Sequence, residues 1–345
     1  MPGFAKRILL VAAAMTAAAI SKISRGDSSP ATQPDQKTGA FAITFTDRSP
    51  LSERSKLWDR LADKDVGPEY NLQNQPFMIY VPNDFSQDKP LGLVVYMSYD
   101  PARQTPATLQ PIFDNRRLIF IVAEKGNLSL LEETGLSIDA VYNLKRRYPI
   151  DDKRAFLMGS GWIEDAGMAT PDIFAGDVWI WNTGYWRNVP VGHNQYYQGI
   201  GHPPSPEMLT LAKRRPHVFG FETDNYNDGV RSLIPGAMTH DGFDHMLTAI
   251  IAGDDVSYPN LKPEWFEKML DMLEPISLAQ AKAKAATRAS AKADASQSLL
   301  NLAQAYMTAG KTDLAMQKLE TLIQEYPTEP AAEKAKALLQ QLQAQ

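Results

Sequence analysis

Short apolar runs alternate with amphipathic stretches along most of the chain. Residues 91–97 and 118–123 are almost continuously apolar, as expected for strands that are buried on both faces of a sheet. Residues 136–148 repeat apolar side chains at helical spacing instead. Further strands are predicted at residues 77–81, 154–158, 178–181, 217–221 and 246–251, and a helix with proline in its first turn at 263–273. This alternation predicts a doubly wound α/β domain over residues 41–276, with a mainly parallel sheet and helices on both faces.

The pattern changes after residue 276. Residues 277–296 are dominated by Ala and Lys and predict a helical or frayed linker. Residues 297–326 carry small and apolar residues at the offsets of a tetratricopeptide repeat, and residues 329–342 predict a further helix. A single repeat cannot build a solenoid. We therefore expect 297–345 to be a small α-helical segment that docks on the main domain, on a copy of itself, or on a protein partner.

The amino-terminal pattern is that of an export signal. Lys6 and Arg7 precede a short alanine-rich apolar run, which predicts a secretory signal peptide over residues 1–20. An uncleaved membrane anchor is the alternative for this segment. Residues 21–40 are rich in Ser, Pro, Gln and Asp and predict a disordered tether. We expect an exported protein, periplasmic or extracellular.

Charge and composition exclude several classes of function. The chain has 345 residues, of which 44% are hydrophobic, so it can bury a full core. Its net charge of −5 gives no footprint for nucleic acid. The sequence contains no cysteine, which excludes disulfides, thiolate metal sites and a thiol nucleophile.

A glycine-flanked turn follows the predicted strand 154–158. Gly159, Ser160 and Gly161 stand where the G-x-S-x-G nucleophile elbow of α/β-hydrolases would lie. Together with the Pro-Asp-Ile-Phe-Ala-Gly element at 171–176, this stretch resembles exported polyhydroxybutyrate depolymerases and feruloyl esterases, and weaker matches extend the resemblance over residues 75–273. The resemblance implies the α/β-hydrolase fold and, in an active member, carboxylic-ester hydrolysis by a serine triad.

Carried over residue by residue, the resemblance gives an incomplete triad. Gly161 takes the nucleophile's position, and Ser160 is a displaced candidate whose hydroxyl is expected to point in another direction. Asp224 matches the acid, although it could equally cap a turn. The loop that carries the family's histidine has Asp254 and Asp255 and no histidine, so a serine hydroxyl would lack its general base.

Other polar residues are weaker candidates for chemistry. We interpret all five histidines as structural or superficial, and keep His193 and His202 as alternative bases for Ser160. Asp224, Asp254 and Asp255 could hold Ca²⁺ if the loops converged, but we interpret them as solvated loop aspartates and predict neither a metal site nor a cofactor.

Aromatic residues are dense around the expected pocket. Flat rings beside polar groups suit saccharide or aromatic-ester ligands, although Trp and Tyr also fill α/β cores. The candidates for ligand contact are Trp162, Tyr185, Trp186, Tyr196 and Tyr197. The insertion from Tyr185 to Gly201 is the better candidate for a lid that faces a ligand.

The sequence therefore favours a pseudo-hydrolase, an exported α/β-hydrolase-like protein that binds a small-molecule ester, a saccharide or a protein partner without hydrolysing it. One alternative is an active serine carboxylesterase that uses the displaced Ser160. Another is a structural envelope protein that assembles through its tetratricopeptide-like repeat.

Overall fold

The structure is a computed structural model, and it describes residues 36–180, 185–192, 195–199, 201–222, 233–251, 258 and 260–343. The predicted signal peptide at 1–20, most of the predicted tether at 21–40, and His193 lie outside the described residues. So do Asp224, Asp254 and Asp255.

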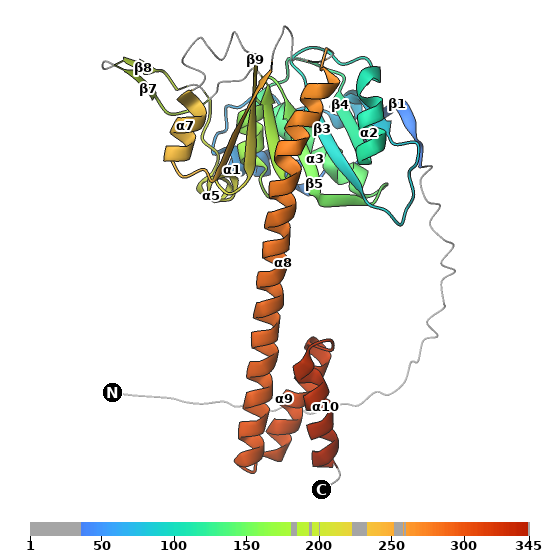
Figure 1. Ribbon diagram of the computed structural model, residues 1–345, viewed down its shortest axis with the longest axis vertical. Coiled ribbons are helices and arrows are strands. Elements are labelled where there is room, and N and C mark those ends of the chain that lie inside the picture. Colours follow the sequence, from blue (N-terminus) through green and yellow to red (C-terminus); the bar gives the residue numbers. More distant parts are fainter. Residues whose placement is uncertain are drawn as a thin grey trace, which may run out of the picture. The chain divides into compact units, whose positions relative to one another are not determined.

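The described residues form an eight-stranded sheet in the order β1-β2-β4-β3-β5-β6-β9-β10 (Figure 1). Its strands are β1 (Gly39–Thr44), β2 (Pro76–Val81), β3 (Leu91–Met97), β4 (Leu118–Ala123), β5 (Ile150–Gly159), β6 (Gly176–Ile180), β9 (Pro216–Glu222) and β10 (His245–Ile251). Strand β2 pairs antiparallel with both β1 and β4, and the ladders from β4 to β10 are parallel. This is an α/β-hydrolase fold, which confirms the predicted fold class.

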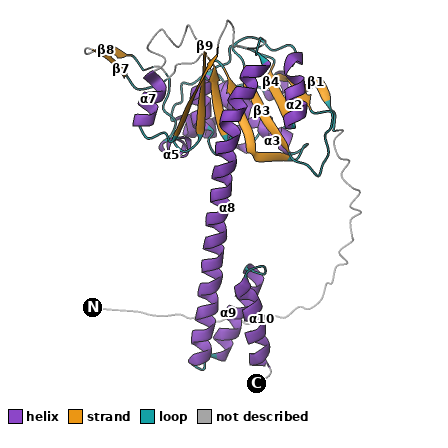
Figure 2. Cartoon of the chain, in the orientation of Figure 1, coloured by secondary structure: helices purple, strands orange, loops and turns teal. Residues whose placement is uncertain are grey.

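Both faces of the sheet are buried, which explains the continuous apolar runs. Along β3, Leu93 and Val95 point into one hydrophobic core, while Val94 and Tyr96 point into the other. The first core includes side chains of α1, α3, α4 and α7, and the second includes side chains of α2 and the start of α8. Figures 1 and 2 show these helices beside the sheet. The central strands therefore have no solvent-facing side that could carry polar residues.

The helices are α1 (Arg54–Leu61), α2 (Gln110–Arg116), α3 (Leu130–Lys145), α4 (Ile163–Ala169), α5 (Pro206–Ala212), α7 (Leu233–His240), α8 (Pro263–Thr308), α9 (Thr312–Glu325) and α10 (Pro330–Gln343). Helix α3 begins earlier than its periodicity predicts, because Ser129 and Glu132 form a capping box at its first turn. The predicted insertion contains a small hairpin, β7 (Val189–Gly192) and β8 (Gln195–Tyr197). Among the described helices, none is long and apolar enough to cross a membrane.

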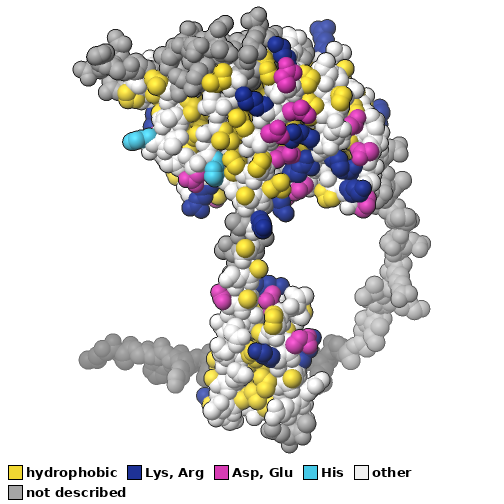
Figure 3. Space-filling view, in the orientation of Figure 1, with side chains coloured by type: hydrophobic (Ala, Val, Ile, Leu, Met, Phe, Trp, Pro, Cys, Tyr) yellow, Lys and Arg dark blue, Asp and Glu magenta, His cyan; other side chains and the backbone are white. Residues whose placement is uncertain are grey.

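Helix α8 runs through the predicted linker without interruption. Its first turns pack on the sheet through Trp265 and Phe266, and its last turns join α9 and α10 in a separate core around Leu300, Leu319 and Leu322. The predicted boundary between residues 276 and 277 falls inside this helix, one residue after Pro275. Arg116 and Arg154 both bind Glu274 and so hold α8 next to α2 and β5. Figure 3 shows basic and acidic side chains interspersed over the face it draws.

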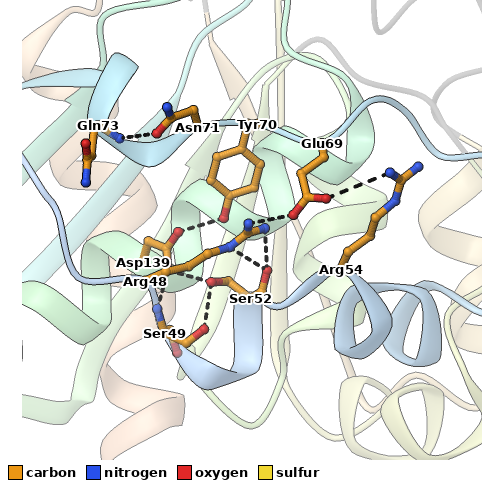
Figure 4. Close-up of polar contacts among 9 residues, drawn as sticks. All are labelled: Arg48, Ser49, Ser52, Arg54, Glu69, Tyr70, Asn71, Gln73 and Asp139. Carbon is orange, nitrogen blue, oxygen red and sulfur yellow. Dashed lines mark hydrogen bonds and ion pairs between the residues drawn. The ribbon is translucent and has the colours of Figure 1, made fainter.

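A buried polar network ties the segment between β1 and β2 to helix α3 (Figure 4). Asp139 accepts hydrogen bonds from the Ser49 backbone at 2.7 Å, the Ser52 hydroxyl at 2.5 Å and the Tyr70 hydroxyl at 2.6 Å. The Arg48 guanidinium lies over the Tyr70 ring and binds Glu69 at 2.8 Å. Because the Asp139 carboxyl is fully buried, these donors offset the cost of its desolvation and fix the segment's position.

Candidate functional site

The tight turn between β5 and α4 lies at the carboxyl edge of the sheet, where α/β proteins place their ligands. Gly159 makes the last ladder pair of β5, with Met97 of β3 on one side and Trp179 of β6 on the other. Gly161 follows with a φ of +107°, in the region that favours glycine. The turn therefore has the sharp strand-to-helix geometry of a nucleophile elbow, with Gly161 at its bend.

The Ser160 side chain turns toward the loop after β3. Its backbone N–H donates to the Met97 carbonyl at 3.0 Å, and its hydroxyl accepts the Tyr99 backbone N–H at 3.2 Å. The residue is 8% exposed. The Ser160 hydroxyl is therefore used as a hydrogen-bond acceptor by the backbone of the loop after β3.

The space beside Gly161 is filled by Glu133, which extends from the first turn of α3. A Cβ atom built on Gly161 would lie within 3.0 Å of Glu133 Oε1, so a serine side chain at this position would overlap the carboxyl group. The Trp162 backbone N–H donates to this carboxyl. Glu133 is 1% exposed, and its Oε2 atom has no hydrogen-bond partner among the described residues. A buried carboxyl thus occupies the place of a nucleophile.

A second buried acid, Asp165, lies in the first turn of α4. Its Oδ2 accepts the His202 backbone N–H at 3.0 Å, and its Oδ1 has no partner. Burial raises the pKa of Asp165 to about 7, against the opposing His202 hydrogen bond. Burial also raises the pKa of Glu133 well above its usual range; the Trp162 N–H opposes this rise and the Asp165 charge adds to it.

The backbone donors that would form an oxyanion hole already have acceptors. In this fold the hole is made by the N–H after the nucleophile and by an N–H from the loop after the third strand. If Gly161 is the nucleophile's position, the first donor is the Trp162 N–H, and the Tyr99 N–H is a candidate for the second. Trp162 donates to Glu133, and Tyr99 donates to Ser160. The arrangement does not present these two donors to a substrate oxygen.

The described histidines have other roles. His217 is buried between Asp177 at 2.7 Å and the Ala212 carbonyl at 2.8 Å, at the amino end of β9. His245 begins β10 at the same edge, opposite Pro216. The His240 side chain is 91% exposed. These three histidines therefore lie away from the carboxyl edge or in solvent.

His202 lies beside the elbow. Its ring is 6.0 Å from the Trp162 ring between centroids, and its Nδ1 is 2.9 Å from an Asp63 carboxylate oxygen. Within the described part of the chain, no histidine is hydrogen-bonded to the Ser160 hydroxyl. His202 is therefore paired with the acid Asp63, but in the described part of the chain it is not hydrogen-bonded to Ser160.

The predicted aromatic contacts separate into two groups. Trp162 and Trp186 are half-buried, and Trp186 packs against Tyr185 at 4.7 Å between ring centroids. Tyr185 is 1% exposed and donates its hydroxyl to Asp241, which also binds Arg187 at 2.8 Å. Tyr185 therefore fixes the insertion to α7. Tyr196 and Tyr197 lie in β8, and their side chains fall outside the description.

Asp224 and Asp255, the candidates for the acid and for the position of the lost base, lie outside the described residues. Within the described ranges, no group of three or more His, Asp or Glu residues is arranged to hold a metal ion.

The sequence patterns did not single out Glu133 and Asp165, which dominate the elbow. One signal pointed to Glu133: it sits in a helix that is apolar or small on almost every side, where an acid cannot reach water. Asp165 carried no comparable signal, because acidic residues are common in the first turn of exposed helices.

Comparison with known proteins gives distant similarity only. No protein-family model and no curated protein matches the chain. A solved thermostable esterase has 13% identity and a TM-score of 0.40, with 67% of this chain and 60% of that one covered. Esterase 2 of Thermogutta terrifontis, phosphonylated by sarin, has 10% identity and a TM-score of 0.39, with 60% of this chain and 90% of that one covered. Its propionate-bound form has 11% identity and a TM-score of 0.37, with 57% and 86% covered. The resemblance to depolymerases and feruloyl esterases stays a prediction.

Proposed function

We propose that this chain is a pseudo-hydrolase, an exported α/β-hydrolase-fold protein that binds a ligand or a protein partner and does not cleave esters. The observation that carries the proposal is the Glu133 carboxyl group, which fills the space of a nucleophile side chain and accepts the Trp162 N–H. A serine at the elbow attacks only if its oxygen, a base and the oxyanion donors face one reaction centre. In this structure, glycine stands at the nucleophile's position. The backbone N–H groups of Trp162 and Tyr99 already donate to Glu133 and Ser160.

Hydrolysis of short p-nitrophenyl esters by the purified full-length protein tests the proposal. We expect turnover no faster than that of a Ser160→Ala variant, because the Ser160 hydroxyl is bonded to Tyr99 and no histidine of the described residues is hydrogen-bonded to it. His202→Ala serves as a second control, since the His202–Asp63 pair is the described dyad beside the elbow. Turnover that both substitutions abolish would establish the alternative, a serine carboxylesterase that uses Ser160 with His202.

The second part of the proposal concerns the carboxyl-terminal helices as a surface for a protein partner or a second copy. Leu302 of α8 and Leu314 of α9 remain 40% and 41% exposed, although the three helices share a core of their own. A partner or a second copy that packed on these helices would cover the two leucines and remove their apolar surface from water. Light scattering of the full chain tests this part. The oligomeric mass of Leu302→Glu is compared with that of the wild type and of Glu320→Lys, a control at an exposed residue. An oligomeric mass that Leu302→Glu leaves unchanged counts against self-assembly.

A further inference from the structure

Residues 201–205, called the strap below, connect the insertion to α5 and lie against the first turn of α4 beside the elbow. Gly201 packs directly on the Asp165 carboxyl group: a Cβ atom built on Gly201 would lie 2.8 Å from Asp165 Oδ1. Its φ of +111° is in the region that favours glycine. The next residue, His202, donates its backbone N–H to Asp165 Oδ2 at 3.0 Å. The strap therefore contacts both oxygens of this buried acid.

The sequence of the strap, Gly-His-Pro-Pro-Ser, leaves it few backbone donors. Proline has no N–H, so His202 and Ser205 carry the two amide donors that follow Gly201. Both donors are used: the His202 N–H binds Asp165, and the Ser205 N–H donates to the Arg60 carbonyl in the last turn of α1 at 2.8 Å. Because the two prolines between these donors fix φ, the segment is stiff, and we expect it to attach or detach as a unit.

The His202 ring makes a third attachment. Its Nδ1 lies 2.9 Å from Asp63 Oδ2, and Asp63 Oδ1 accepts the Asp65 N–H at 2.8 Å, which holds the carboxylate in place. Both side chains are partly exposed, so the contact contributes only modestly. An imidazole is charged in acid and neutral in alkali. The contact with Asp63 is therefore an ion pair only at the acid end.

The closed strap favours the protonated form of Asp165. The Asp165 carboxyl is fully buried, and its Oδ1 has no hydrogen-bond partner among the described residues. Burial raises the pKa of Asp165 to about 7. With the strap detached, water would reach the carboxyl and its pKa would fall toward the ordinary value. Each pH unit between the two pKa values then favours the open form about tenfold.

The charged groups on the elements that pack against α4 do not offset this effect. Within the described ranges, no ion pair joins a cation to Asp165, and the basic groups nearby are paired elsewhere. The groups are Glu133 and Glu132 of α3, with Glu132 paired to Lys125; Arg60 of α1, paired to Asp172; Arg154 of β5, paired to Glu274; Asp177 of β6, paired to His217; and Glu207 of α5, which is exposed.

We propose that residues 201–205 are a pH-sensitive strap, closed beside the elbow in acid and released as the pH rises through neutrality. Two ionisations act in the same direction. Ionisation of Asp165 favours the open form, and loss of the imidazole charge weakens the contact between His202 and Asp63. Release would uncover Asp165 and the Trp162 ring, whose centroid is 6.0 Å from that of the His202 ring. The inference holds whether or not the elbow hydrolyses esters.

Hydrogen–deuterium exchange of the full-length protein at pH 5.5 and pH 8.5 tests the inference, with rates corrected for the intrinsic effect of pH. Peptides that cover the strap report the His202 and Ser205 amides. We expect their protection to be about thirtyfold or more lower at pH 8.5, because about 1.5 pH units separate pH 5.5 from the pKa of Asp165. Amides of β3 should exchange more slowly than the strap at both pH values, which distinguishes a local opening from global unfolding. Equal protection of the strap at the two pH values, or strap amides that exchange only together with β3, would overturn the inference.

Variants assign the effect to its residues. Asp165→Asn keeps an acceptor for the His202 N–H but does not ionise, so the change with pH should shrink to at most about fivefold, the part left to His202 and Asp63. Asp63→Asn should lower protection at pH 5.5 by up to about fivefold. Asp59→Asn, the same charge change at an exposed residue of α1, should leave it unchanged.

Thermal melting shows whether each variant is folded. A pH effect that folded Asp165→Asn retains in full would contradict the role of Asp165. If Asp165→Asn does not fold, the wild-type comparison still decides between a strap that opens and one that stays closed.

Discussion

Two of the buried carboxylic acids of helix α3, Asp139 and Glu133, lie less than two turns apart and differ in how fully they are hydrogen-bonded. Asp139 accepts three donors from the segment between β1 and β2. Glu133 accepts the Trp162 N–H and leaves Oε2 without a partner. Asp139 therefore stabilises the fold, whereas Glu133 is buried at the elbow with only part of its hydrogen-bonding capacity used. Local rules of polar pairing fail most often at functional sites, so the incomplete pairing of Glu133 makes the elbow a candidate for one.

The largest expected effect comes from truncating the two acids. Asp139→Ala removes the acceptor of the buried Ser49 N–H and of the Tyr70 hydroxyl, while Ser52 keeps the Ser49 carbonyl as an acceptor, and it should lower the free energy of unfolding by about 3–5 kcal/mol. Glu133→Ala removes a poorly paired acid and should cost less than about 2 kcal/mol. Urea denaturation of the two variants measures the difference. Equal losses would mean that Glu133 is as well integrated as Asp139 and would remove the contrast between them.

The pH dependence of stability extends the comparison to Asp165, the other buried acid at the elbow. The raised pKa of Asp165, about 7, means that its folded form holds a proton that the unfolded chain releases at lower pH. Wild-type stability should therefore fall as the pH rises from the unfolded pKa toward the folded one. Asp165→Asn removes this dependence, so its stability relative to wild type should rise by on the order of 3 kcal/mol between about pH 5 and pH 8.

Denaturation curves at the two pH values measure this change. A constant difference between Asp165→Asn and the wild type would show that Asp165 is ionised in the folded protein at both. Glu133→Gln should shift in the same direction, because burial raises the pKa of Glu133 as well.

Restoring a serine at the bend of the elbow probes the space that Glu133 fills. Gly161→Ser should cost about 2–3 kcal/mol, because the residue has a φ of +107° and its Cβ would overlap Glu133. Gly236→Ser is the matched control, since a Cβ there meets nothing within 4 Å. Adding Glu133→Ala should recover part of the loss. A Gly161→Ser protein as stable as the control would show that the space is open.

Ser160→Ala should have the smallest effect. It removes one hydrogen bond to the Tyr99 N–H, which contributes about 1 kcal/mol. The measurement is again denaturation in urea. A loss several times larger would indicate that the Ser160 hydroxyl has a structural role beyond this bond.

The core of the fold could be predicted from the sequence, because strands buried on both faces leave continuous apolar runs such as those of β3 and β4. Strand β1 was missed: it lies at the sheet edge with alternating burial and pairs with one strand. Helix α4 leaves no clear periodic pattern in the sequence, because its seven residues include two buried acids, Glu164 and Asp165, which resemble those of an exposed polar turn.

The candidate site was predictable only in part. Order along the chain was enough to place Gly161 at the bend and to question Ser160. The role of Glu133 depends on contact between α3 and the elbow, residues that lie far apart in sequence.

The central claim is that the elbow has lost its nucleophile, and covalent labelling tests it most directly. The folded full-length protein is incubated with a fluorophosphonate probe beside Ser160→Ala and a heat-denatured sample, and intact mass is measured. An active serine would add one probe per chain, because its base makes the hydroxyl nucleophilic. The account predicts an unchanged mass for the wild-type protein. Stoichiometric labelling that disappears in Ser160→Ala would contradict it.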